Sequence, residues 1–269
     1  MTAEPSREQD AAAIAQAFVA ARLSQAATPD YPGELPTTMS RSYEIQEAAI
    51  TLFPDAIIGW KVGGVPPAQQ PALGIHRLAG PIFARNQWTD NGATNTLPVI
   101  EGGFAAVEAE FIARIGIDAD PAQLDWTVED AMDQIDAVFI GIELAGSPLS
   151  AINDLGSAIV ASDFGNNGGL LVGAELADWR ERMDGVVVET VIDGVVVGTG
   201  GATSLAGGAM ESVRFLLEHC ARRGRPLTKG TLISTGAVTG VHRIYAGSDW
   251  SCDFQGVGRI KGVTVPATA

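Results

Sequence analysis

The sequence has few basic residues and no long apolar run. Its 269 residues include 17 Lys and Arg against 32 Asp and Glu, so the formal net charge is −15. This balance argues against binding to nucleic-acid phosphates, because no basic stripe is available. No segment reaches the apolar length of a membrane span, and the acidic residues 1–10 do not resemble a signal peptide. We therefore expect a cytoplasmic protein that binds neither nucleic acid nor membranes.

Cysteine is scarce, and several common catalytic motifs are missing. Cys220 and Cys252 are too few for a disulfide framework, which favours a reduced, cytosolic protein. The three histidines form no HExxH set, and there is no Walker-type Gly-Lys-Ser/Thr and no Gly-x-Ser-x-Gly elbow. The glycine-rich stretches 198–201 and 256–258 lack the strand-to-helix context of a dinucleotide site. A serine-hydrolase triad and a nucleotide site therefore have no support in the sequence.

The order of the predicted elements indicates an α+β fold with a mainly antiparallel or mixed sheet. Residues 7–25 and 40–52 are predicted helices, the first with Ser6 as a candidate N-cap, and we assign residues 1–55 to an N-terminal helical subdomain. Residues 56–269 are assigned to a catalytic domain, where short β-like runs alternate with Gly and Pro. The predicted strands are 57–62, 82–84, 105–115, 137–144, 185–191, 195–199, 231–235 and 260–265, and the predicted helices are 128–135 and 206–222. Asp193-Gly194 is a strong signal for a two-residue hairpin.

Three glutamates form the most informative pattern of the chain. Glu108 and Glu110 are two apart in an alternating stretch, so on a strand both carboxylates project from one face. Glu143 lies in an apolar run, where burial of a lone carboxylate is costly. Carboxylates that lie close together repel unless a proton or cation intervenes, and Mg²⁺ or Mn²⁺ suits oxygen ligands. The alternative is that Glu108 and Glu110 line the wet face of an antiparallel strand and pair with Arg114 or another base.

An ordered set of motifs resembles the fumarylacetoacetate hydrolase superfamily. The motifs are Gly59-Trp-Lys-Val-Gly63, Glu108-Ala-Glu110, Ile142-Glu-Leu144, Ala161-Ser-Asp-Phe-Gly-Asn-Asn-Gly168, Leu227-Thr-Lys-Gly-Thr-Leu-Ile-Ser-Thr-Gly236, Ala246-Gly-Ser-Asp249 and Asp253-Phe-Gln-Gly-Val-Gly258. Within the superfamily, the sequence is most similar to the branch of 2-keto-4-pentenoate hydratases and 4-oxalocrotonate decarboxylases. The likeness extends from about residue 7 to the C-terminus and includes the N-terminal helices.

The resemblance implies a mixed β-roll with the active site in its mouth, assembled into a homo-oligomer. It also implies that Glu108, Glu110 and Glu143 hold Mg²⁺ or Mn²⁺, which a small 2-oxo acid substrate chelates through its carboxylate and 2-oxo group. Lys61 corresponds to the lysine of the family's Gly-aromatic-Lys motif, which could donate or accept a proton in dienol–ketone tautomerisation. On the residues alone, Lys61 could instead extend from a strand edge to solvent.

Four further residues are candidates for substrate binding. Asp163 and Asn166 match the family segment that orders the site, although turn-forming side chains would also explain them. Thr235 matches a stretch near the substrate carboxylate, or it simply ends a strand. His76 lies in a stretch where the family carries acidic residues, and His76 or Arg77 could replace them.

Three segments depart from the family pattern in regions that select the reaction. Gly146-Ser147-Pro148 replaces Asp-Ser-Arg, residues 206–208 replace Gly-His-Pro, and residues 73–81 lack the expected acids. Our leading prediction is a metal-dependent lyase of the hydratase type, acting on a short 2-hydroxydienoate or 2-oxo-alkenoate. The alternatives are an acylpyruvate-type C–C bond hydrolase, a 2-oxo acid decarboxylase, or a non-catalytic member that acts as a partner subunit.

Overall fold

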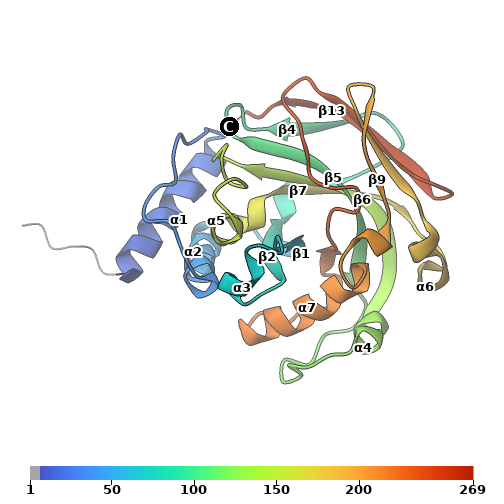
Figure 1. The fold of residues 1–269 in the computed structure, drawn as a ribbon, viewed down its shortest axis with the longest axis horizontal. Helices are drawn as coiled ribbons and strands as arrows, with labels where there is room; N and C mark the ends of the chain where they lie inside the picture. Colours follow the sequence, from blue (N-terminus) through green and yellow to red (C-terminus); the bar gives the residue numbers. More distant parts are fainter. Residues whose placement is uncertain (1–6, 269) are drawn as a thin grey trace, which may run out of the picture.

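The computed structural model describes residues 7–268 as two curved β-sheets with helices packed around them (Figure 1). The α-helices are α1 (Arg7–Leu23), α2 (Met39–Leu52), α3 (Gln70–Leu73), α4 (Val128–Asp133), α5 (Ser157–Ser162), α6 (Trp179–Arg182) and α7 (Ala209–Arg222). The strands of the larger sheet are β1 (Ile57–Gly64), β2 (Arg77–Phe83), β3 (Gln87–Thr89), β5 (Phe104–Ile115), β6 (Ile135–Ser147), β7 (Asn167–Glu175), β10 (Leu232–Ser234) and β11 (His242–Arg243). The strands of the smaller sheet are β4 (Asn95–Val99), β8 (Val188–Ile192), β9 (Val195–Gly200), β12 (Asp249–Phe254) and β13 (Gly258–Pro266).

Both sheets mix parallel and antiparallel pairs. The larger sheet has the order β2-β1-β10-β5-β6-β7-β3, with β11 also paired to β5, and the smaller has the order β4-β13-β12-β8-β9. The pairs β1–β10, β3–β7 and β4–β13 are parallel, and the remaining neighbours are antiparallel. The long pair β5–β6 forms the middle of the larger sheet. This curled, mixed arrangement confirms the predicted α+β fold of the β-roll type.

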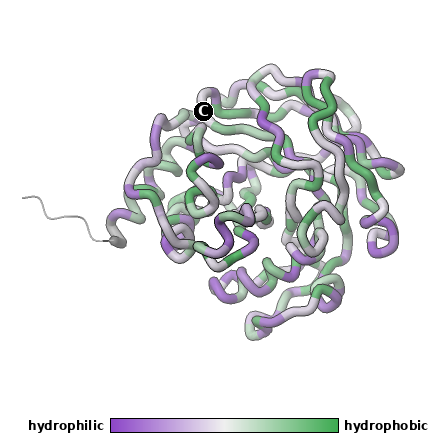
Figure 2. Tube along the Cα trace, in the orientation of Figure 1, coloured by the Kyte–Doolittle hydropathy of each residue, from purple (hydrophilic) through white to green (hydrophobic). Residues whose placement is uncertain are grey.

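The central strands are apolar because both of their faces are covered. Every residue of β5 is buried except Arg114, which is partly exposed and bonds Asp136 at 2.7 Å. On one face, the ring of Phe111 contacts that of Phe254 edge-to-face and joins β5 to the smaller sheet. Figure 2 shows mostly white to green hydropathy along these strands, whereas hydrophilic positions gather in loops and in α7. The alternative that Glu108 and Glu110 line a solvent-exposed face of this strand is therefore excluded.

The two N-terminal helices pack against each other and share the buried core with the larger sheet. Both are present within two residues of the predicted bounds, while Ser6 lies outside the described residues. Helix α2 packs against α1 and α5, and its buried Gln46 donates to the carbonyls of Ala79 and Ala161 at 2.9 and 2.7 Å. Ile14 and Phe18 of α1 share one buried apolar cluster with the strands. The division into domains at residue 55 stays a prediction.

Several element bounds differ from the predicted ones, and pairing explains the differences. The run predicted at 82–84 is the end of β2, which continues back to Arg77 because it pairs with β1. The strand predicted from 185 begins at Val188, since Gly185 lies in a 3₁₀ turn. Asp193 and Gly194 both have positive φ (49° and 79°), as the predicted hairpin turn requires. Among the described residues, no helix is long and apolar enough to cross a bilayer.

Candidate metal centre

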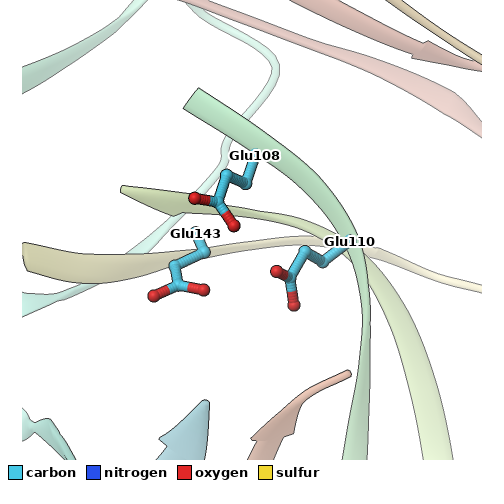
Figure 3. Close-up of side chains that lie close together, drawn as sticks. All are labelled: Glu108, Glu110 and Glu143. Carbon is cyan, nitrogen blue, oxygen red and sulfur yellow. The ribbon is translucent and has the colours of Figure 1, made fainter. Parts of the chain in front are cut away.

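The three predicted glutamates converge in the middle of the larger sheet (Figure 3). Glu108 and Glu143 are direct partners in the β5–β6 register, and Glu110 lies two residues further along β5, opposite Gly141. One carboxylate oxygen from each glutamate lies within 4.8 Å of the others. Glu110 and Glu143 are fully buried and Glu108 is 5% exposed, so all three carboxylates are removed from water.

The hydrogen bonds of these carboxylates leave oxygens free toward the centre of the cluster. Oε2 of Glu110 accepts hydrogen bonds from the Ser234 hydroxyl at 2.6 Å and the Gly236 N–H at 2.7 Å. Oε1 of Glu143 accepts from Nδ2 of Asn167 at 3.0 Å. Among residues 7–268, Oε1 of Glu110 has no hydrogen-bond partner, and Oε2 of Glu143 is accompanied only by the Lys61 ammonium. Buried oxygens without donors are uncommon, and an oxygen set of this kind fits a hard divalent cation.

The charges of the cluster are unfavourable without a counter-ion. Burial raises the pKa of Glu108 to about 8, the charge of Glu143 adds to the rise, and Lys61 opposes it. Burial and then the charges of Glu143 and Glu108 raise the pKa of Glu110 well above its usual value. Both shifts report the free-energy cost of ionising neighbouring carboxylates in a poorly solvated place. A bound cation would remove that cost, which is a second reason why these residues fit a metal.

Lys61 extends from the middle of β1 toward the glutamates. Its Nζ lies 3.3 Å from Oε2 of Glu143, and the side chain is 6% exposed, which excludes the alternative that it reaches out to solvent. Burial alone would lower the pKa of Lys61, but the charges of Glu143, Glu108 and Glu110 outweigh burial and raise it. The ammonium is therefore charged and held beside the carboxylates.

A tight loop between α5 and β7 packs against Lys61. Phe164, Gly165 and Asn166 all have positive φ (52°, 65° and 62°), which is a costly conformation for the two residues that are not glycine. The loop lies directly on Gly80, the register partner of Lys61, because a Cβ atom at Gly80 would be 1.9 Å from the Phe164 carbonyl oxygen. This close approach places Asn166 beside the lysine.

A cavity of about 660 Å³ opens from the cluster, and most of the predicted site residues line it. Its polar wall includes Lys61, Glu108, Asn166, Thr235, His76, Arg77, Asn153 and Ser212. Asn166 donates from Nδ2 to Asn153 at 3.3 Å, and its buried Oδ1 has no partner among the described residues. The Thr235 hydroxyl donates its hydrogen to the Phe111 carbonyl at 2.8 Å, so it has no hydrogen left to donate to a ligand. His76 is exposed at the cavity wall, with Nδ1 bonded to Gln70 at 2.7 Å.

Asp163 differs from the other candidates because it does not line this cavity. Its Oδ1 accepts from Nε of Arg22 at 2.6 Å, and its Oδ2 accepts from Nη2 of Arg22 at 2.9 Å and from the Ser147 hydroxyl at 2.6 Å. The side chain is fully buried and both oxygens are occupied. Asp163 therefore ties α1 to the loop that carries Asn166, and its predicted role in substrate binding stays a prediction.

Four groups support the cluster, and sequence reasoning missed two of them, Ser234 and Arg22. Ser234 and the Gly236 N–H hold Glu110, Asn167 holds Glu143, and Arg22 donates to the Asn167 carbonyl at 2.8 Å. Asn167 and Gly236 lie inside motifs quoted above, so their neighbourhood was visible. Arg22 had no local signal, because its partner Asp163 lies 141 residues further along the chain.

In sequence, the chain is similar to curated proteins named as hydratases. The chain is 26% identical over 238 residues to the TodF product hydratase of Pseudomonas putida F1, covering 86% of each chain. It is also 26% identical over 208 residues to a 2-keto-4-pentenoate hydratase of Paraburkholderia xenovorans LB400, covering 76% of this chain and 75% of the relative. No protein-family model matches the sequence.

Solved structures with similar folds contain divalent metals. The 4-oxalocrotonate decarboxylase of Pseudomonas putida G7, determined with calcium and acetate and with magnesium and adipate, superposes with a TM-score of 0.79. It is 20% identical and aligns with 97% of this chain and 99% of its own. The fumarylpyruvate hydrolase of Pseudomonas aeruginosa, with Mn²⁺ and pyruvate, gives a TM-score of 0.59 at 16% identity over 77% of this chain and 89% of its own. The predicted resemblance to the fumarylacetoacetate hydrolase superfamily, and to its hydratase and decarboxylase branch, is confirmed.

Proposed function

We propose that this protein is a Mg²⁺- or Mn²⁺-dependent lyase of the hydratase type, acting on a short 2-hydroxydienoate or 2-oxo-alkenoate. The observation that carries the proposal is the buried cluster of Glu108, Glu110 and Glu143, with oxygen atoms left unpartnered beside the Lys61 ammonium. The similarity to proteins named hydratases supports the same reaction class.

In this proposal the three glutamates hold the cation, and hydrogen bonds orient Glu110 and Glu143. When bound, a divalent ion supplies positive charge that stabilises the enolate developing beside the 2-oxo carbon. The Ser234 hydroxyl and the Gly236 N–H keep one oxygen of Glu110 in place, so the other points into the cluster. Asn167 does the same for Glu143.

Lys61 is the proposed catalytic residue, and its role is proton transfer. The charged Nζ is buried beside the cavity, where it can donate a proton to a carbon of the dienol while the 2-hydroxyl proton is released to water and the ketone forms. The glycine at position 165 allows this side chain to lie against the loop, since a Cβ atom there would be 3.1 Å from Cδ of Lys61.

Asn166 is proposed to contact the substrate or the added water. Its Oδ1 is a buried acceptor without a donor among residues 7–268, and it lines the same cavity as Lys61. A substrate hydroxyl or the water that adds to the double bond would satisfy this acceptor. Thr235 contributes mainly backbone to the cavity wall, because its hydroxyl is bonded to Phe111.

Decarboxylation of a 2-oxo acid is the second candidate reaction. The overall fold matches a 4-oxalocrotonate decarboxylase over nearly the whole chain, and both reactions need the same stabilised enolate. Histidine-assisted hydrolysis of an acylpyruvate has weaker support, because the match to a fumarylpyruvate hydrolase covers 77% of this chain and Nδ1 of His76 is bonded to Gln70. Assembly into a homo-oligomer and a cytoplasmic location remain predictions.

Turnover of a substrate panel tests the proposal. Purified protein with Mg²⁺ or Mn²⁺ should consume a short 2-hydroxydienoate faster than buffer does, and the product should carry the added water. Lys61→Met should lose this turnover while it retains metal-dependent binding of oxalate, a mimic of the 2-oxo carboxylate. Release of CO₂ instead of hydration would favour the decarboxylase. Wild-type protein that binds oxalate but leaves every dienol and 2-oxo acid untouched would favour the non-catalytic partner subunit.

A further inference from the structure

The cavity that opens from the glutamate cluster is also lined by a second, partly buried cation, Arg77. Arg77 begins β2 and lies opposite Gly64, whereas Gly80 on the same strand lies opposite Lys61. Three residues of strand separate the two positions, which corresponds to roughly 10 Å. Arg77 and Lys61 both line the same cavity.

Contacts on two sides hold the guanidinium in place and leave one nitrogen available. Nη2 of Arg77 donates to the Ala206 carbonyl, and Nε donates weakly to the Ser212 hydroxyl at 3.4 Å. Nη1 makes no hydrogen bond to any residue in the range 7–268. Its approach to Oε1 of Glu211 is 3.9 Å, which is beyond hydrogen-bonding distance.

Glu211 does not neutralise Arg77, because another arginine uses both of its oxygens. Arg214 donates to Oε1 and Oε2 of Glu211 at 2.6 and 2.7 Å, and also to Glu218 at 2.6 Å. Arg222 donates to the second oxygen of Glu218 at 3.1 Å. This row of ion pairs therefore contains three arginines and two glutamates, and the arginine at the cavity is the one without a close partner.

The environment of Arg77 favours an anionic ligand. Its side chain is only 12% exposed, so water solvates the guanidinium poorly. Desolvation lowers the pKa of Arg77, and the charge of Glu211 only partly compensates. A ligand carboxylate would supply both the missing charge and the missing acceptors.

Two other arginines, Arg85 and Arg243, do not line the cavity that contains Lys61. Arg85 is bonded to Asp55 and lines a separate cavity of about 260 Å³. Arg243 donates to the Ser150 hydroxyl at 2.7 Å and lies over the Phe104 ring. Of these three, only Arg77 reaches the cavity that contains Lys61.

We propose that Arg77 binds an anionic group at the end of the substrate remote from the glutamates, so that the site takes 2-oxo acids with a second carboxylate. The inference rests on the proposed function, which places the 2-oxo acid end at the glutamates. Arginine suits this role because its N–H groups are arranged to match the two oxygens of a carboxylate.

A matched pair of ligands tests this assignment. 2-Oxoadipate and 2-oxohexanoate have the same chain length and differ only in the terminal carboxylate. Calorimetry with Mn²⁺ present should show that wild-type protein binds 2-oxoadipate about tenfold to a hundredfold more tightly, as a charge-assisted hydrogen bond allows. Arg77→Gln should lose this preference while binding of 2-oxohexanoate and oxalate is unchanged. Arg85→Gln, at the separate cavity, is the matched control and should keep it.

Each other outcome has a definite meaning. Equal binding of the two ligands by wild-type protein, or a preference that survives in Arg77→Gln, would overturn the role of Arg77 and leave the metal centre intact. Arg77→Lys keeps the charge without the paired donors, so a reduced preference is expected even if Arg77→Gln fails to fold; an undiminished one would count against the assignment. Wild-type protein that binds no oxalate with either metal would overturn the proposed function itself, and this inference with it.

Discussion

Replacing Glu108 with glutamine should stabilise the metal-free protein and abolish its response to metal. Burial raises the pKa of the Glu108 carboxyl group to about 8, and the charge of neighbouring Glu143 adds to the rise. The pKa of Glu108 is higher in the folded than in the unfolded protein. The contribution of this group to stability is therefore fully present below pH 4.5, its ordinary pKa, and is lost as the pH rises toward 8. At pH 7 this loss amounts to at most about 3 kcal/mol. Glutamine has similar size and no charge, so Glu108→Gln should recover part of it.

Metal should stabilise the wild-type protein much more than Glu108→Gln. A cation at a hundred times its dissociation constant adds about 2.7 kcal/mol to the free energy of unfolding. For a chain of this size, that corresponds to a rise of about 5–10 °C in the thermal midpoint. Wild-type protein should show this rise with Mn²⁺, and Glu108→Gln should show little of it because one of three carboxylate ligands is gone.

Thermal unfolding at pH 5, 7 and 8, with chelator or with Mn²⁺, measures both effects. The gain of metal-free Glu108→Gln over wild type should grow with pH across this series. Glu175→Gln, an exposed glutamate of β7, is the matched control and should follow the wild type in every condition. A Glu108→Gln protein that is no more stable than wild type at pH 8, or that keeps the full rise with Mn²⁺, would refute the reasoning.

Three further predictions concern residues around the site. Burial against Tyr43 and Phe215 lowers the pKa of His219 to about 3, so stability is lost as pH falls below 6.5. Between pH 7 and 5, the free energy of unfolding from denaturant titrations should therefore fall about 2 kcal/mol less for His219→Gln than for wild type, and parallel pH curves would contradict this. Ser234→Ala removes one donor to Glu110 and should weaken Mn²⁺ binding about tenfold in a titration, with an unchanged affinity speaking against the proposed orientation of the carboxylate. Gly80→Ala would press a methyl group onto the Phe164 carbonyl, so we expect a loss of about 1–3 kcal/mol in unfolding measurements together with weaker oxalate binding. Wild-type stability and binding in that variant would show that the loop can move aside freely.

The metal cluster could be predicted from the sequence because its signals are local. The spacing of Glu108 and Glu110 places both on one face of a strand, and Glu143 stands out in an apolar run. What could not be predicted is the register that sets Glu108 opposite Glu143, because it depends on pairing along the whole of β5 and β6. The ion pair of Asp163 could not be predicted for the same reason, since its partner Arg22 comes from a distant helix.

The strands missed by sequence reasoning are also those with weak local signals. β7 begins with Asn167-Gly-Gly, which reads as a turn, yet it pairs with β6 and with β3. Its first residue holds Glu143, so the fold uses a turn-like sequence at the place where a polar side chain must reach the cluster. Such local conflicts are expected at functional sites.

The location of each group explains why the glutamates and Lys61 were easier to predict than the reaction. The glutamates and Lys61 lie in the middle of paired strands, where the ladder fixes both the face and the spacing of a side chain. Arg77 lies at a strand end and Asn166 in a loop with positive φ, where a few substitutions change which group faces the substrate. In the proposed function, the part of the substrate that chelates the metal therefore meets side chains fixed by the sheet, whereas the tail of the 2-oxo acid meets side chains at a strand end and in a loop. Substrate screening should accordingly keep the 2-oxo acid constant and vary the length and charge of the tail.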